Sequence, residues 1–260
     1  MPKKRLDQLV LDRGLAPTRA KAQALIMAGE ISVNGAAMTK PGHGVAEDAP
    51  VSLISKGPKF VSRGGLKLAG ALDHFHIAPK GLVCLDVGAS TGGFTDCLLQ
   101  RGAGHVYAID VGKGQLDPKI RSDSRVTWRE KFHARHLRPD LFPHAIDLAV
   151  VDVSFISLRK VLPFVIACLG DGGRLLALIK PQFEASRKDV TKGGVLRDET
   201  KRQEILESFR AYAPNELGLT DVDISDAVIS GPKGNREAFL YGRKPAQNRA
   251  LKSELIPSHC

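Results

Sequence analysis

Apolar residues at helical and strand spacing predict a small α+β unit at the start of the chain. A helix is predicted over residues 5–12, and Thr18 is a typical N-cap for a second helix. Two short apolar runs, 31–33 and 51–54, predict strands that follow this second helix. These elements are too few for a large core, so we expect a compact accessory unit.

Longer apolar runs alternate with helical segments through the rest of the chain. The run at 145–151 is apolar almost throughout, as is typical of a central strand that is buried on both faces. The alternation predicts an α/β fold with a doubly wound, mostly parallel sheet. The other predicted strands are 82–85, 105–109, 126–128, 172–179, 222–229 and 237–241, and helices are predicted at 94–100, 158–169 and 199–212.

Breaks in these patterns divide the chain into four segments. The α+β unit covers 1–56, and a Gly-Pro pair marks a linker at 57–64. The α/β unit covers 65–244, and we expect the polar tail at 245–260 to be disordered.

A glycine-rich turn follows the first strand of the α/β unit. The strand ends at Asp86, Gly88 begins the turn, and Gly92 and Gly93 lead into a helix at Phe94. Glycine allows close approach of the backbone to a ligand, and a helix N-terminus offers unbonded N–H groups. This arrangement predicts a ligand site, although an ordinary α/β turn has similar residues.

An acid at the end of the next strand adds to this prediction. Asp110 lies roughly 20 residues beyond the glycine turn, where an acid suits a pair of ribose hydroxyls. The pattern Gly-x-x-x-Gly-Gly, with Asp86 two residues ahead, differs from that of dinucleotide sites. It resembles the first motif of methyltransferases that use S-adenosyl-L-methionine, and a dinucleotide site is the alternative.

The net charge of +10 favours a polyanionic partner, either nucleic acid or an acidic membrane surface. Residues 1–67 hold 11 Lys and Arg against 5 Asp and Glu, and therefore carry +6 of this charge. No apolar run approaches the ~20 residues of a membrane span, so we expect no membrane insertion.

The four cysteines and eight histidines show no spacing typical of a metal site, so no metal is predicted. Cys84 and Cys168 lie in apolar runs and Cys97 in a predicted helix, which predicts buried thiols. Reduced cysteines and the lack of a signal peptide favour a cytoplasmic location. The sequence does not predict an oligomeric state.

The first unit resembles the small RNA-binding domain first known from a ribosomal small-subunit protein, the S-four type. The resemblance rests on Arg5-Leu-Asp7, Thr18-Arg19, Leu25-Ile26 and Val33-Asn34-Gly35. It implies that the basic edge of the second helix contacts folded RNA. The predicted RNA-binding residues are Arg5, Arg13, Arg19 and Lys21, joined by Arg63 of the linker; the alternative is a solvated basic face.

Charged residues directly follow several predicted strands. The carboxyl ends of parallel strands share one edge of a sheet, so Asp86, Asp110, Asp152 and Lys180 should lie along that edge. Lys67 and Glu237 can reach the same edge from outside the parallel strands. Buried charges are costly unless they are paired, and a cluster of lysines and acids can satisfy itself.

The residues after the fourth strand indicate the type of reaction. Asp152-Val-Ser-Phe155 lacks the prolines of amino-group methyltransferases, and the region has no cysteine for carbon-5 pyrimidine methylation. Lys67, Asp152, Lys180 and Glu237 match the Lys-Asp-Lys-Glu tetrad of FtsJ-like RNA ribose 2′-O-methyltransferases. These four are the predicted catalytic residues.

The whole set of motifs resembles the hemolysin-A-like (TlyA) family. This resemblance implies a Rossmann-like methyltransferase sheet and 2′-O-methylation of cytidine in ribosomal RNA, with ribosomal subunits as partners and S-adenosyl-L-methionine as cofactor. The implied cofactor-binding residues are Asp86, Gly88, Ser90, Gly92, Gly93, Phe94, Asp110 and Glu130. The family's Glu-x-x-Asn pattern is replaced here by Glu130-Lys-Phe-His133.

The sequence allows two roles for Lys180 and two competing functions for the protein. Lys180 is the candidate group nearest the 2′-hydroxyl, and it either accepts the proton or only positions and polarises the hydroxyl. A non-enzymatic RNA-binding or ribosome-assembly factor and a membrane-active hemolysin are the competing functions.

Overall fold

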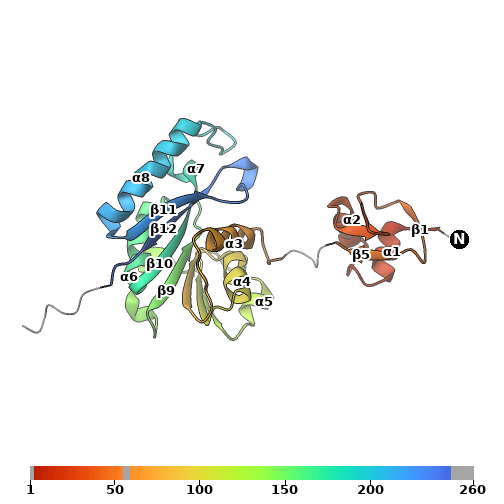
Figure 1. The fold of residues 1–260 in the computed structure, drawn as a ribbon, viewed down its shortest axis with the longest axis horizontal. Helices are drawn as coiled ribbons and strands as arrows, with labels where there is room; N and C mark the ends of the chain where they lie inside the picture. Colours follow the sequence, from red (N-terminus) through yellow and green to blue (C-terminus); the bar gives the residue numbers. More distant parts are fainter. Residues whose placement is uncertain (1–2, 55–58, 247–260) are drawn as a thin grey trace, which may run out of the picture. The chain divides into compact units, whose positions relative to one another are not determined.

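The computed structural model describes residues 3–54 and 59–246 of the chain. These residues form two compact units, and each unit is described by itself (Figure 1). The boundary between the two units falls inside the predicted linker, 57–64. Nearly all of the predicted tail, from residue 247 onward, lies outside the described residues.

The N-terminal unit packs two helices against short strands. Strand β2 lies between β3 and β5 in one small sheet, and β1 pairs with β4 in another. Thr18 accepts a hydrogen bond from the backbone N–H of Lys21, which confirms the predicted N-cap. The elements are β1 (Lys3–Arg5), α1 (Leu6–Asp12), α2 (Arg19–Met27), β2 (Ile31–Val33), β3 (Ala36–Met38), β4 (Gly44–Ala46) and β5 (Val51–Leu53).

The second unit contains a seven-stranded sheet with the order β11-β12-β10-β9-β6-β7-β8. Strands β10, β9, β6, β7 and β8 are parallel, whereas β12 runs antiparallel to both of its neighbours. The predicted α/β class with a mostly parallel sheet is therefore confirmed. The strands are β6 (Val83–Val87), β7 (His105–Ile109), β8 (Val126–Arg129), β9 (Ile146–Val151), β10 (Leu169–Ile179), β11 (Thr220–Asp226) and β12 (Ala238–Arg243).

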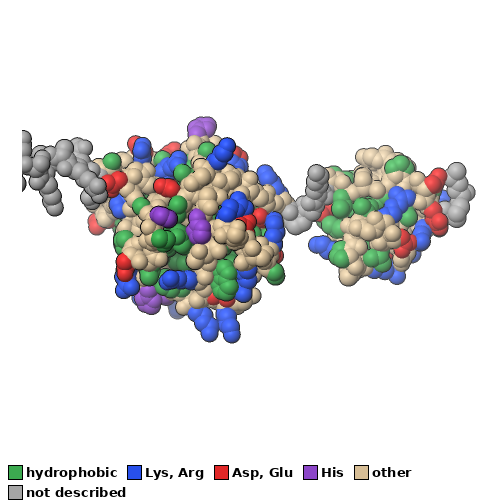
Figure 2. Space-filling view, turned by 90° about the horizontal axis from the view of Figure 1, so that it is seen from below, with side chains coloured by type: hydrophobic (Ala, Val, Ile, Leu, Met, Phe, Trp, Pro, Cys, Tyr) green, Lys and Arg blue, Asp and Glu red, His purple; other side chains and the backbone are tan. Residues whose placement is uncertain are grey.

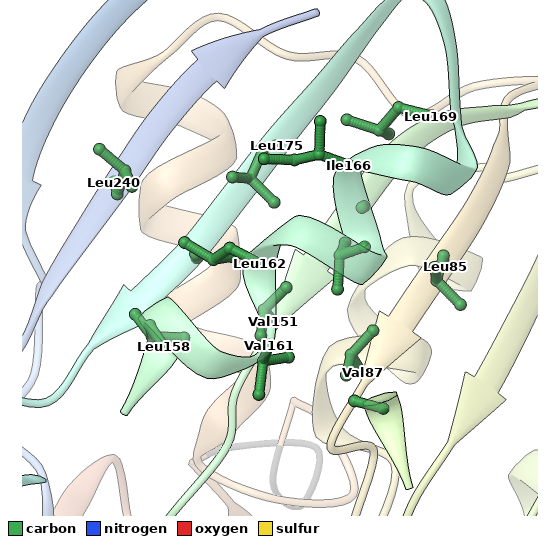
Figure 3. Close-up of a cluster of buried hydrophobic side chains, with 14 of the residues drawn as sticks. Leu85, Val87, Val151, Leu158, Val161, Leu162, Ile166, Leu169, Leu175 and Leu240 are labelled. Carbon is green, nitrogen blue, oxygen red and sulfur yellow. The ribbon is translucent and has the colours of Figure 1, made fainter. Parts of the chain in front are cut away.

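Helices cover both faces of this sheet. Leu85, Val87 and Val151 point to the face that α6 and α8 cover, and they pack with Leu162 and Ile166 of α6 (Figure 3). The other face packs against α3, α4 and α5. The helices are α3 (Gly64–His74), α4 (Gly93–Gln100), α5 (Pro118–Arg121), α6 (Leu162–Cys168), α7 (Pro181–Glu184) and α8 (Glu199–Leu217).

Several predicted boundaries were wrong. Helix α6 begins at Leu162 rather than 158, because Pro163 is tolerated in the first turn and a short 3₁₀ helix precedes it. Helix α8 continues to Leu217 although Pro214 lies within it. Strand β6 extends to Val87, so Asp86 lies inside the strand rather than after it.

Candidate active site

The strand ends bring predicted catalytic residues to one edge of the sheet. Asp152 follows β9, Lys180 follows β10, and Glu237 directly precedes the antiparallel strand β12. Ile179 pairs with Ala238, so the ends at Lys180 and Glu237 lie side by side, about 5 Å apart as neighbouring strands are. Strand β9 is the next neighbour on the other side of β10.

Lys67 and Glu237 form a buried ion pair between helix α3 and this edge. The ammonium of Lys67 donates to Glu237 Oε2 at 2.5 Å, and the two side chains are 9% and 0% exposed. Glu237 Oε1 has no hydrogen-bond partner among the described residues. Gly231 packs directly on this carboxylate, since an added Cβ there would lie 2.1 Å from Oε1. The pair is therefore enclosed by the chain rather than by solvent.

Lys180 and Asp152 form a second ion pair at the neighbouring strand ends. Lys180 Nζ lies 2.6 Å from Asp152 Oδ1, and it donates a hydrogen bond to Ser154 Oγ at 2.7 Å. The side chains of Lys180 and Asp152 are 12% and 22% exposed, so this pair is open to a substrate. The structure thus brings all four residues to one edge, as two ion pairs. Their catalytic roles stay a prediction.

A cavity of about 640 Å³ borders the same edge. Asp152 belongs both to the cavity wall and to the ion pair with Lys180. Gly88, with a φ of +88°, carries the backbone past the Asp152 carbonyl, which would lie 2.3 Å from an added Cβ. A side chain at Gly88 would therefore push β6 and β9 apart at the cavity.

Only part of the predicted cofactor set lines this cavity. Gly88, Ser90 and Asp110 do, and the Asp110 carboxylate accepts hydrogen bonds from the N–H groups of Ser90 (2.8 Å) and Gly112 (2.6 Å). Asp110 thus joins the glycine turn to the loop after β7. Apolar side chains that sequence reasoning missed form much of the remaining wall: Val87, Ile109, Val111, Phe132, Ala134 and Val153.

The other members of the predicted set lie behind the cavity wall. Gly92 caps α4, Gly93 begins it, and Phe94 is buried against Phe239 at 6.0 Å between ring centres. Glu130 accepts hydrogen bonds from the N–H groups of Gly114 and Gln115 and pairs with Arg121 at 2.6 Å. The structure therefore shows Glu130 holding a loop rather than lining the cavity.

Asp86 is also behind the wall, fully buried within β6. One carboxylate oxygen accepts a hydrogen bond from Thr95 Oγ1 at 2.6 Å, and the other has no partner among the described residues. Burial raises the pKa of Asp86 to about 7, and the nearby charges of Asp152 and Asp110 act in the same direction. Among the residues that the structure describes, no basic side chain is a cause of this pKa, so a cationic group in the adjacent cavity would be favoured electrostatically.

One exposed aromatic beside the edge was missed as a candidate. Phe155 is 90% exposed, has a φ of +62°, and lies 4.9 Å from Phe183 between ring centres. It also lines the cavity. The signal in the sequence was its position directly after the Asp152-Val-Ser motif.

Two of the predicted RNA-binding arginines of the N-terminal unit, Arg5 and Arg19, bind a buried acid. Asp7 is 0% exposed and accepts hydrogen bonds from Arg5 (3.1 and 3.0 Å), Arg19 (3.1 Å) and Gln23 (2.8 Å). The Arg5 guanidinium above all holds the pKa of Asp7 well below its usual range. Arg5 and Arg19 keep 54% and 49% of their side-chain surface exposed, so their charges remain accessible to phosphate.

The remaining predicted contacts differ from these two. Arg13 donates to the carbonyls of Ala49 (2.8 Å) and Glu47 (2.6 Å) and so fastens the turn before β5. Lys21 and Arg63 are exposed. Figure 2 shows Lys and Arg side chains on the surface of both units. RNA binding by all five residues stays a prediction.

The described residues contain no group of three or more His, Cys, Asp or Glu that could hold a metal ion. Cys84, Cys97 and Cys168 are buried, as predicted. Among the helices of the described part of the chain, none is both long and apolar enough to cross a bilayer.

The parallel sheet with one inserted antiparallel strand, and a cavity beside the glycine turn, define the class of Rossmann-like methyltransferases. The model of the FtsJ-like methyltransferase family matches residues 60–244, and the S4 domain model matches residues 4–51. The chain therefore belongs to the FtsJ-like methyltransferase family, and its first unit is an S4 domain.

Proteins that are similar to this chain over most of its length carry more specific names than the family. The chain is 41% identical to a 16S/23S rRNA (cytidine-2′-O)-methyltransferase, TlyA, of Mycobacterium tuberculosis, over 96% of this chain and 93% of that one. It is 42% identical to Hemolysin A of Brachyspira hyodysenteriae, over 91% of this chain and 98% of that one. A solved structure from Streptococcus thermophilus that carries the name hemolysin has 40% identity and a TM-score of 0.71, and the match covers 94% of this chain and 90% of that one.

Proposed function

We propose that this methyltransferase transfers a methyl group from S-adenosyl-L-methionine to a ribose 2′-hydroxyl of ribosomal RNA, with cytidine as the target. The observation that carries the proposal is the position of Asp152, which lines the cavity and pairs with Lys180. The cavity and this ion pair therefore meet at Asp152. The name of the M. tuberculosis relative supports the choice of reaction and substrate.

The residues of the cavity fit this cofactor. Asp110 directly follows β7, where its carboxylate can accept hydrogen bonds from ribose hydroxyls, and apolar walls at Ile109 and Phe132 can enclose an adenine. The acids Asp86 and Asp152 would favour a ligand with positive charge on its methionine end, because a cation there would stabilise the ionised form of Asp86 and lower its pKa. When bound, the cofactor supplies an electrophilic methyl group on a sulfonium.

The chain's own residues then act on the hydroxyl. Methylation of the 2′-oxygen would require the hydroxyl proton to leave, and a residue beside the hydroxyl would have to accept that proton or orient the hydroxyl. Lys180 is the most accessible amine of the two ion pairs. It either takes this proton in its neutral form, or stays charged and orients the hydroxyl while solvent takes the proton.

The same proposal assigns RNA contacts to both units. Half-exposed Arg5 and Arg19 would contact phosphates, which gives affinity without sequence choice. Phe155 would stack on a nucleobase beside the target ribose, because its ring is exposed at the cavity edge. A cytoplasmic location, where ribosomal subunits assemble, is part of this proposal.

The experiment measures transfer of a tritiated methyl group from the cofactor to isolated ribosomal subunits, followed by mapping of ribose methylation. We expect a single cytidine to be labelled on each substrate subunit. The Lys180→Ala variant should lose transfer by at least about 100-fold, with cofactor affinity within about twofold of the parent.

Other outcomes separate the competing functions. Tight binding of subunits without label would favour a non-enzymatic assembly factor. Leakage of liposomes caused by the pure protein would favour the membrane activity that the name of the B. hyodysenteriae relative suggests. Undiminished transfer by Lys180→Ala would remove Lys180 from the mechanism.

A further inference from the structure

Arg202 of helix α8 is a buried cation outside the two ion pairs of the active site. It is 3% exposed, and its guanidinium binds Glu199 at 3.1 Å and Asp226 at the end of β11. Its Nε also donates to the backbone carbonyl of Arg236 at 3.3 Å. Arg236 is the residue directly before Glu237, so the contact reaches the active site through one peptide unit.

The same two acids also bind Arg236. Its guanidinium lies 2.9 Å from Glu199 Oε2 and 2.9 Å from Asp226 Oδ2. Two arginines and two acids therefore form a closed cluster with no net charge. Glu199 and Asp226 are half exposed, whereas Arg202 is buried. Water can therefore replace the contacts of the acids more easily than those of Arg202, and the loss of Arg202 should disturb the cluster most.

The cluster closes the base of the loop that runs from β11 to β12. At this base the N–H of Ala227 donates to the Glu237 carbonyl at 2.9 Å. Further along, the loop places Gly231 against the Glu237 carboxylate. Asn235 ties the other side of the loop down, since its side chain bonds the Leu196 N–H at 3.2 Å and the Gly194 carbonyl at 3.0 Å.

We infer that Arg202 is a positioning residue for methyl transfer, which fixes Glu237 against Lys67 by clamping the backbone of Arg236 at the base of the β11–β12 loop. This inference rests on the proposed function, because it takes Glu237 as part of the catalytic group. Lys67 and Glu237 are 2.5 Å apart with little room for water, so a small shift of the backbone would separate them. Displacements of about 1 Å at such sites lower rates by as much as about 100-fold.

The test is a double-mutant cycle with Arg202→Met and Glu237→Gln. In the parent protein, Arg202→Met should lower kcat about 10-fold or more, with KM for cofactor and for ribosomal subunits within about twofold. In the Glu237→Gln background the same change should lower kcat by less than about twofold, since Arg202 acts through Glu237. Arg202→Lys should restore part of kcat.

Arg210 provides a matched control on the same helix. It pairs with Glu207 (3.4 Å) and with Asp223 of β11 (3.2 Å), and both of these partners lie outside the loop before Glu237. Arg210→Met should leave kcat within about twofold. Equal losses from Arg202→Met in both backgrounds, or a loss expressed in KM, would overturn the inference.

A second variant, Asp226→Asn, and amide hydrogen exchange test the same clamp independently of Arg202→Met kinetics. If Arg202→Met does not fold, Asp226→Asn loosens the same clamp at a half-exposed position and should lower kcat alone; an unchanged kcat would contradict the inference. Amide hydrogen exchange separates this result from the proposed function. Even if the protein methylates no RNA, Arg202→Met should speed exchange at Ala227, whose partner is the Glu237 carbonyl, and not at Asp110, which bonds Arg129 in the other half of the sheet.

Discussion

Two buried acids, Asp7 in the S4 domain and Glu237 in the methyltransferase unit, hold basic side chains in opposite ways. Asp7 is surrounded by Arg5 and Arg19, which keep about half of their surface in solvent. Glu237 holds Lys67, which is 9% exposed. The first arrangement fixes the direction of cations that remain accessible to a large anion, whereas the second encloses the charge pair.

The difference teaches what each site requires. An RNA-binding surface needs charges that reach phosphate oxygens and exchange their counterions, so its arginines must stay hydrated until RNA arrives. A catalytic group, the role proposed for Lys67 and Glu237, needs a fixed geometry, and a dry ion pair between α3 and the start of β12 would provide it. A substitution at Asp7 should therefore change the affinity for ribosomal subunits, and a substitution in the Lys67–Glu237 pair should change kcat.

The largest effect is expected at Glu237. Replacing it with Gln keeps the shape but removes the charge that pairs with Lys67, so kcat should fall by about 100-fold or more. The affinity for subunits, measured by filter binding, should stay within about twofold. A comparable loss of subunit affinity would mean that Glu237 serves binding, and the contrast with Asp7 would be lost.

Asp7→Asn should produce the reverse pattern. Without the carboxylate, Arg5 and Arg19 lose their fixed direction, and subunit affinity should fall about 10-fold while kcat at saturating subunits is retained. The S4 domain should also lose about 1.5 kcal/mol of its free energy of unfolding, because the charge-assisted hydrogen bonds of Asp7 weaken while Arg5 and Arg19 stay half exposed to water. Urea denaturation and filter binding check the two effects.

Asp86 provides a third case for the comparison with Asp7 and Glu237, because it is a buried acid that has no basic partner among the described residues. The last of the expected effects concerns this residue. Its folded pKa is about 7, above the ordinary value of 3.8, so the folded state keeps a proton that the unfolded state has lost. The stability that this group contributes is present below pH 3.8 and is lost as pH rises through 7.

The corresponding variant is Asp86→Asn, which cannot ionise. Relative to it, the parent should lose on the order of 2 kcal/mol of unfolding free energy between pH 5 and pH 7.5. The sign is opposite for Asp7, whose lowered pKa gives stability above its ordinary value that is lost as pH falls. A flat difference between parent and Asp86→Asn across this range would show that Asp86 is ionised when folded.

Much of the fold could be predicted because apolar runs and helical spacing are local patterns that indicate strands and helices. The apolar run at β9 and the strand that begins near Ala238 required no knowledge of their neighbours. Strands β2 and β5 were predicted because each has two large apolar residues in alternation. Strands β1, β3 and β4 are equally short but lack this pattern, and they were missed. The end of α8 was placed too early because a helix supported by tertiary packing can continue past Pro214.

The candidate site was predictable to the extent that it follows strand ends. The residues after β9 and β10 had to share an edge once the sheet was parallel, and the resemblance to known families supplied Lys67 and Glu237. The wall of the cavity was only partly predicted. Asp86, Gly92, Gly93, Phe94 and Glu130 are not among the residues that line it, because their side chains or backbone are used in contacts within the fold.

The sequence by itself determined the α/β class, the order of the strands in the methyltransferase unit, the glycine turn, the charge of the S4 domain, and Asp152 and Lys180 as candidates that follow strands. These depend on neighbours in the chain or on motifs with fixed spacing. Only the tertiary structure decided which lysine pairs with which acid, that Arg13 fastens a turn, and that Arg202 lies beside the residue before Glu237. Ion pairs have no signature in the sequence, because the partners are chosen by the packing of helices on the sheet.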